Sequence, residues 1–269
     1  MLGTLGRLFG GSTMGRGSFR RHVESVIARR LPGARIEATG PLTLRIEVGD
    51  DHSVARLDNA FARYAAGHET LEAVCESYLD SLADSLAELG GPDPRLPPLD
   101  RLIATVRHGD LVTDPELAGH TVSRPIAGDL HQVLSLDAPR YMRHVTPDEV
   151  AALGVPADAL HDRAAGQVMA IMGPPDYQSL GRVTMPMGGG VYESSLVVVD
   201  AFWDAMRQRH GAAMVFAVPT RDVLLVGPDE AAVQDDIAGM AASIFRDNAH
   251  AISPALHRWR EGRIAPIEG

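Results

Sequence analysis

The sequence predicts an α+β fold in two parts, a small helix–hairpin–helix N-terminal unit followed by a larger mixed α+β domain. Three observations support this prediction. Apolar residues recur at helical spacing in several segments, and short apolar runs rich in strand-forming residues lie between those segments. Between the two parts, four prolines fall within the nine residues 90–98. Proline fits neither the interior of a helix nor a central strand, so we place a linker there.

The N-terminal part is expected to hold a flexible segment at 1–17 and a folded unit at 18–89. The flexible segment is rich in glycine and has arginines but no acid. A short helix that docks on a membrane surface or a partner is the alternative for this segment. Periodicity, caps and turn residues predict the elements of the folded unit. These are a helix at 18–31, a hairpin at 34–39 and 42–48, a helix capped by Ser53 and a longer helix capped by Thr70.

The larger domain is expected at 99–269, and its first half combines strands with clear helix starts. Thr146 is followed by Pro147 and then by Glu149, which is the pattern of a capping box with proline at the first helical position. A second helix is expected to begin near Pro156. The predicted strands lie at 102–106, 121–126, 132–136 and 141–145.

The last third of the chain reads as helix, strand, turn, strand and helix. Strand 223–226 is an unbroken apolar run, which indicates that both of its faces are covered, and the two flanking helices are the expected covers. Ser253 and Pro254 are interpreted as the start of one more short helix. The predicted elements are a helix from Ser194 or Ser195 to 209, strands at 214–218 and 223–226, a helix capped by Asp229, a helix at 253–259 and a strand at 263–267.

This last third resembles a bacterial protein family. The motifs that carry the resemblance are AVPTRDVLL at 217–225, ISPAL at 252–256 and EGRIAP at 261–266, with looser similarity at 101–107 and 130–149. They are similar to the C-terminal signature of the YtpQ-like proteins, the domain-of-unknown-function family numbered 1444. The resemblance covers roughly residues 99–269 and implies a YtpQ-like α+β domain there. The family brings no known activity, cofactor or catalytic residue, so the resemblance implies none here.

Composition excludes several classes of function. The chain carries 35 acidic residues against 25 basic ones, a net charge of −10, which disfavours a nucleic-acid partner. All the basic residues are arginine, so there is no lysine for a P-loop, a Schiff base or a general base. The single cysteine, Cys75, excludes an internal disulfide and a multi-cysteine zinc site. No apolar run could span a bilayer and residues 1–10 lack a signal-peptide core, so we expect no stable membrane insertion and a cytoplasmic location.

Two places in the last third hold candidate contact residues. Arg221 and Asp222 lie at the predicted tip of a hairpin, and Asp247 and His250 follow the last long helix. We regard these four as candidates for contact with a ligand or a partner. The alternative for the hairpin tip is ordinary turn chemistry, in which an aspartate satisfies turn amides. A metal site is not predicted, because zinc needs three or four convergent ligands and Pro254 separates His250 from His257.

A third candidate is the glycine-rich stretch of Gly188, Gly189 and Gly190, which precedes a predicted helix. Backbone N–H groups in such a loop can bind an anion at the start of the helix. The spacing is neither that of a Walker motif nor that of a dinucleotide-binding loop, and Glu193 lies close by in sequence. A flexible connector is the alternative interpretation.

These observations favour a non-catalytic binding or adaptor protein with an unknown protein partner. The chain has no nucleophile elbow, no metal-ligand spacing and no nucleotide loop, so we assign no catalytic residue and no cofactor. The alternative is an enzyme or small-ligand sensor whose site is assembled from scattered Asp, His and Arg residues. A deep cavity lined by Arg221, Asp222 or His250 would favour the alternative, and a flat apolar patch would favour the adaptor. The sequence predicts no particular oligomeric state.

Overall fold

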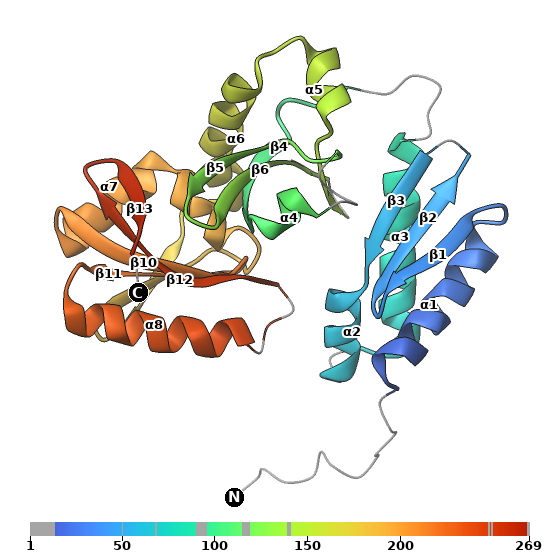
Figure 1. The fold of residues 1–269 in the computed structure, drawn as a ribbon, viewed down its shortest axis with the longest axis horizontal. Coiled ribbons are helices and arrows are strands. Elements are labelled where there is room, and N and C mark those ends of the chain that lie inside the picture. The colour runs from blue at the N-terminus through green and yellow to red at the C-terminus, as the bar shows by residue number, and fades with distance from the viewer. Residues whose placement is uncertain are drawn as a thin grey trace, which may run out of the picture. The chain divides into compact units, whose positions relative to one another are not determined.

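The computed structural model describes residues 14–49, 51–67, 69–89, 96–114, 119–138, 141–246, 248 and 250–267. The fold is α+β, as predicted. The chain divides into two compact units, Met1–Arg95 and Leu96–Gly269, which we call unit 1 and unit 2 (Figure 1). The division falls inside the predicted linker. Residues 90–95 of that linker and 1–13 of the predicted flexible segment lie outside the described residues.

Unit 1 contains a three-stranded antiparallel sheet in the order β1-β2-β3 and helices packed against it. Its elements are α1 (Arg16–Arg30), β1 (Arg35–Gly40), β2 (Thr43–Val48), β3 (Asp51–Arg56), α2 (Asp58–Ala65) and α3 (Leu71–Leu89). Helix α1 includes residues 16 and 17, which the sequence had placed in the flexible segment. The cap of α3 is confirmed, because the hydroxyl of Thr70 accepts a hydrogen bond of 3.2 Å from the N–H of Ala73.

One predicted helix of unit 1 is partly a strand. The helix expected from Ser53 onward begins only at Asp58, and β3 pairs with β2 along its whole length. This pairing sets Ala55 opposite Leu44 and buries both side chains. Pairing with β2 stabilises this segment as a strand by more than its short helical pattern favours a helix. The N-terminal unit therefore holds a third strand in addition to the predicted hairpin.

The core of unit 1 lies between the sheet and its helices. Phe19 of α1 is fully buried, and its ring packs edge-on against Phe61 with ring centroids 5.4 Å apart. Cys75 is buried in the same core, and burial followed by the nearby Glu72 raises the pKa of its thiol. Other buried members are Val23, Ile27, Leu42, Leu44, Ile46, Leu57, Val74, Leu79 and Leu82.

The first half of unit 2 forms a four-stranded antiparallel sheet in which β4, β6 and β5 lie in that order and β7 also pairs with β6. Its elements are β4 (Leu102–His108), α4 (Asp110–Thr113), β5 (Ser123–Ala127), β6 (Leu130–Asp137), β7 (Met142–His144), α5 (Pro147–Leu153) and α6 (Ala157–Met172). The predicted capping box of α5 is confirmed. The N–H of Glu149 donates to the hydroxyl of Thr146 at 3.3 Å, and a carboxylate oxygen of Glu149 accepts from the N–H of Thr146 at 2.9 Å.

The second half of unit 2 forms a six-stranded sheet in the order β13-β12-β10-β11-β9-β8. Its elements are β8 (Asp176–Leu180), β9 (Val183–Met187), the 3-10 helix η1 (Glu193–Val198), α7 (Asp200–His210), β10 (Ala213–Thr220), β11 (Val223–Pro228), α8 (Ala231–Arg246), β12 (Ala251–Arg260) and β13 (Arg263–Pro266). The β8–β9 hairpin was not predicted. The predicted helix from Ser194 is a 3-10 turn, and the α-helix begins only at Asp200.

The short helix predicted at 253–259 is wrong, because this segment lies inside strand β12. Strand β12 pairs with β10 on one side and β13 on the other. Its register with β10 shifts between Leu256 and Ser253, so Pro254 falls in a bulge. A bulge residue needs no ladder hydrogen bond, and proline is therefore tolerated there.

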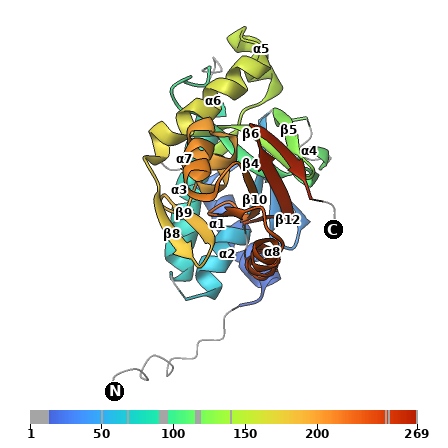
Figure 2. The same cartoon turned by 90° about the vertical axis from the view of Figure 1, so that its left-hand side faces the viewer.

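Both faces of β11 are covered, as the unbroken apolar run predicted. Leu224 packs in the main core of unit 2, which includes Trp203 of α7, and Leu225 packs beneath Ile237 of α8. Figure 1 shows α8 along one face of the six-stranded sheet, and Figure 2 views this helix nearly end on. Among the described residues, no helix is long and apolar enough to cross a membrane.

Candidate functional site

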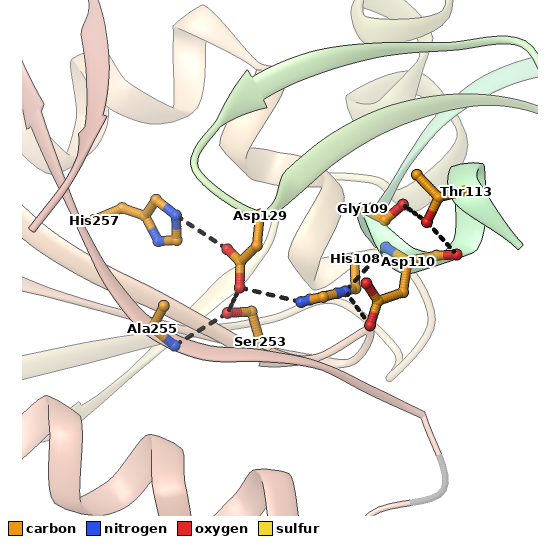
Figure 3. Close-up of polar contacts among 8 residues, drawn as sticks. All are labelled: His108, Gly109, Asp110, Thr113, Asp129, Ser253, Ala255 and His257. Atoms are coloured by element: carbon orange, nitrogen blue, oxygen red, sulfur yellow. Dashed lines mark hydrogen bonds and ion pairs between the residues drawn. The ribbon is translucent and has the colours of Figure 1, made fainter. Parts of the chain in front are cut away.

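Side chains from two strands of unit 2, β4 and β12, meet at the carboxylate of Asp129, in the turn between β5 and β6 (Figure 3). The hydroxyl of Ser253, from β12, donates to Asp129 Oδ2 at 2.5 Å. His108, at the end of β4, places Nε2 at 3.4 Å from the same oxygen. His257, also from β12, places Nε2 at 3.5 Å from Oδ1. We call these four residues the Asp129 cluster.

The Asp129 cluster is buried on the β12 side and open on the β4 side. Ser253 and His257 are fully buried, whereas the side chains of His108 and Asp129 are 36% and 29% exposed. Burial lowers the pKa of His257, although Asp129 and two backbone carbonyls act in the opposite direction. Gly128 permits this approach, because it has a positive φ of 56° and a Cβ there would lie 3.3 Å from the His257 ring.

The hydrogen bonds of the Asp129 cluster argue against acid–base catalysis. The N–H of Asp110 donates to Nδ1 of His108 at 3.1 Å, and Asp110 Oδ2 lies 3.3 Å from the same nitrogen; when Nδ1 accepts this hydrogen bond, a neutral ring carries its proton on Nε2, toward Asp129. The single lone pair of this imidazole is then already used. Ser253 donates to a carboxylate and accepts from the N–H of Ala255 at 3.1 Å, and no histidine in the described part of the chain accepts its proton. The arrangement instead fastens the β5–β6 turn to β12.

The structure brings three of the predicted contact residues together at the turn between β10 and β11. The N–H of Arg221 donates to the carbonyl of His250 at 3.2 Å, and the carbonyl of Arg221 accepts from Ser194 at 3.1 Å. Asp222 accepts from the hydroxyl of Thr220 at 2.7 Å, which is the turn chemistry expected of an aspartate. Asp247, the fourth predicted residue, lies outside the described residues.

Arg107 of β4 joins this group and was not predicted. Burial, and then the neighbouring Arg221, lower the pKa of Arg107 to about 10. Burial, and then Arg221, also lower the pKa of His250 to about 4, while Asp222 acts to raise it. The guanidinium of Arg107 donates to the carbonyl of Val106 at 2.8 Å, and no carboxylate pairs with it among the described residues. We call Arg107, Arg221 and His250 the arginine cluster.

A tyrosine and an aspartate lie beside the arginine cluster. The hydroxyl of Tyr192 donates to Oδ1 of Asp137 at 2.5 Å. Burial, and then this hydrogen bond, raise the pKa of Tyr192, whereas Arg221 acts to lower it. The pair Tyr192–Asp137 links the start of η1 to the end of β6, near Arg221.

The glycine-rich loop already holds a carboxylate of this chain. The N–H groups of Gly188 and Gly190 donate to one oxygen of Glu193 at 2.8 and 2.7 Å. Glu193 is 1% exposed. An external anion at Gly188, Gly189 and Gly190 would therefore compete with Glu193 for two of the predicted donors. In the described part of the chain, no group of three or more His, Cys, Asp or Glu side chains is arranged to hold a metal ion.

The described surface includes two open hollows. One, of about 420 Å³, lies in unit 2 beside the β8–β9 turn, and the other, of about 520 Å³, lies in unit 1 between α1 and β1. Neither is lined by Arg221, Asp222 or His250, so neither is the cavity that would favour a small-ligand site at those residues.

Comparison with known proteins found no match. No family model matches the chain, and searches of the curated proteins and of the solved structures found no match either. The resemblance to the YtpQ-like proteins therefore stays a prediction from the sequence.

Proposed function

We propose that unit 2 is a non-catalytic binding module that accepts a carboxylate of a partner protein at the arginine cluster. Arg107 carries this proposal, because its guanidinium is half-buried beside that of Arg221 and has no carboxylate partner among the described residues. Placing two like charges together in a partly desolvated site costs folding free energy. Residues that reduce the stability of the fold in this way are common at functional sites.

A protein carboxylate suits the geometry better than an enclosed small molecule. A guanidinium forms two parallel hydrogen bonds with a carboxylate, and arginine is enriched at protein interfaces. Neither of the two hollows includes a residue of the arginine cluster. Because the whole chain carries a net charge of −10, a strongly acidic partner would be repelled at long range. We therefore expect the carboxylate to stand on an otherwise neutral or basic surface.

An enzyme is the second candidate. Its best site is the Asp129 cluster, where the hydrogen bonds leave His108 without a free lone pair. We favour binding for this reason. On sequence grounds we also propose a cytoplasmic location, no nucleic-acid partner and kinship with the YtpQ-like proteins. These parts of the proposal rest on composition and on the C-terminal motifs.

An affinity pull-down with mass spectrometry tests the proposed function. The tagged protein, its Arg107→Gln variant and the control Arg207→Gln are compared at low and high salt. Arg207 is a matched control, because it is an exposed arginine paired with Asp204 on α7 and is not a member of the arginine cluster. We expect a partner that is retained by the control, lost with Arg107→Gln and weakened by salt.

Thermal melts of the three proteins must accompany the pull-down, so that loss of binding is not confused with loss of fold. A set of bound proteins that is the same for the original chain and Arg107→Gln would refute the proposed contact site. A partner identified in this way can then be altered at its own acidic residues, and the matching loss of binding would identify the carboxylate.

A further inference from the structure

The hollow of about 420 Å³ in unit 2 has a polar and partly basic lining. It lies between the β8–β9 turn, the C-terminal end of α7 and the residues that follow β11. The side chains that matter for its chemistry are Ser179, Arg182, Thr184, Arg209, His210 and Glu230. We propose that this hollow binds a small hydrophilic ligand through an oxyanion, a carboxylate or a phosphate, which pairs with Arg209.

The charges in the hollow leave one guanidinium available. Arg182 pairs with Glu230 through both of its terminal nitrogens, so these two charges offset one another. The side chain of Arg209 makes no hydrogen bond or ion pair in the described part of the chain. Two guanidiniums against one carboxylate give the lining an excess positive charge, which favours an anionic ligand.

Arg209 is also held in position before any ligand arrives. Its guanidinium carbon lies over the ring of Tyr177, 4.4 Å from the centroid. Such a cation–π contact fixes the side chain without using its N–H groups as hydrogen-bond donors. A guanidinium that is fixed but not hydrogen-bonded can present two parallel donors to an oxyanion.

The other polar groups of the hollow are neutral. His210 Nε2 lies 2.9 Å from the hydroxyl of Thr184, and burial followed by Arg209 and Arg182 lowers the pKa of His210, which keeps the ring neutral at pH 7. Together with the hydroxyl of Ser179, these groups can exchange hydrogen bonds with hydroxyls of a ligand. The volume lies within the usual range of ligand sites, roughly 300–1,000 Å³, and the polar lining fits a hydrophilic ligand better than an apolar one.

Helix electrostatics explains part of this arrangement. Arg207, Arg209 and His210 all lie in the last turn of α7, where basic residues complement the negative end of the helix. This effect accounts for the presence of basic side chains at that position. It does not account for the stacking of Arg209 on Tyr177, or for the convergence of the β8–β9 turn and Glu230 on the same hollow.

Calorimetric titration of the full-length protein with inorganic phosphate and with malonate, at constant ionic strength set by chloride, tests the proposal. We expect saturable binding of at least one of the two anions. Arg209→Gln should weaken that binding at least tenfold, whereas Arg207→Gln should leave it unchanged. Binding of only one anion would identify the ligand group as a phosphate or as a carboxylate, and binding of both would identify an oxyanion site open to either.

A second readout locates the binding. The ring nitrogen signals of His210, assigned by comparison with His210→Gln, should shift with the same saturation curve as the calorimetric heat. The proposal is overturned if neither anion binds saturably, or if Arg207→Gln weakens binding as much as Arg209→Gln does. Loss of anion binding in Arg107→Gln would also overturn it, because the anion would then belong to the arginine cluster.

Discussion

Lowering the pH from 7 to 4.5 should destabilise unit 2 through His161, a buried imidazole of α6. The side chain is 1% exposed, and neither of its ring nitrogens has a hydrogen-bond partner among the described residues. Burial, and then the neighbouring Arg124, lower its pKa from 6.5 to about 4, while Asp158 and Asp162 act to raise it. The folded protein therefore keeps this imidazole neutral over a range in which the unfolded chain protonates it.

The sign and size of the effect follow from proton linkage. As the pH falls below 6.5, the unfolded chain takes up a proton that the folded protein does not, so the free energy of unfolding decreases. The loss accumulates until the pH reaches the folded pKa of about 4. The difference between these two pKa values corresponds to a total decrease of about 3 kcal/mol in the free energy of unfolding. About 2.5 kcal/mol of this decrease has occurred by pH 4.5.

Urea melts followed by tryptophan fluorescence between pH 7 and 4.5 measure this loss. Both tryptophans, Trp203 and Trp259, are stacked in the core of unit 2, so their emission reports the unfolding of this unit. The variant His161→Phe should lose about 2.5 kcal/mol less than the original protein over this range.

The matched control is Val168→Ala on the same helix, which removes a fully buried methyl pair and no titratable group. It should lower stability by a similar amount at every pH and keep the pH profile parallel to that of the original protein. The reasoning would be refuted if the difference in the free energy of unfolding between His161→Phe and the original protein stayed constant within about 0.5 kcal/mol across the range. His161 would then protonate equally in the folded and unfolded states.

Three further predictions concern stability and use the same urea melts. Leu224→Ala and Leu225→Ala should each cost about 2–5 kcal/mol, because the two side chains are fully buried on opposite faces of β11, and a nearly neutral result for either would mean that its face is open. Asp129→Asn should cost about 1–3 kcal/mol, because it removes the charge that accepts from Ser253, and an unchanged midpoint would show that the turn is held by other contacts. Arg107→Gln should raise stability by about 1 kcal/mol, since it relieves burial and repulsion from Arg221, and a clear loss of stability would contradict the functional interpretation of Arg107.

Local signals predicted much of the fold. The capping box at Thr146, the turn between β10 and β11 and the long periodic helices α6 and α8 all have their causes within a few neighbouring residues. Two strands were taken for helices, because six to ten residues of mixed pattern do not distinguish the two periods. In β12 the proline was interpreted as a helix start, whereas the structure uses it in a bulge that depends on pairing with β10.

The candidate sites were predictable only in part. Arg221 and His250 were named from their places at a turn and after a helix. Arg107 lies in an apolar strand, and it becomes a candidate only because Arg221, far along the chain, lies beside it in the fold. The Asp129 cluster was not predicted at all. Its hydrogen bond between Asp129 and Ser253 spans 124 residues, and no pattern within one sequence indicates that such positions meet.

Arg107 and His108 are consecutive residues of β4 that belong to different clusters. His108 is held by Asp129 on one side and by the N–H of Asp110 on the other, which fixes the backbone at the end of this strand. The strand end is therefore ordered when the protein folds, and its ordering adds no entropy cost when a partner binds. Docking at Arg107 would then cost mainly the freedom of one side chain, so a partner could reach useful affinity through a small contact area.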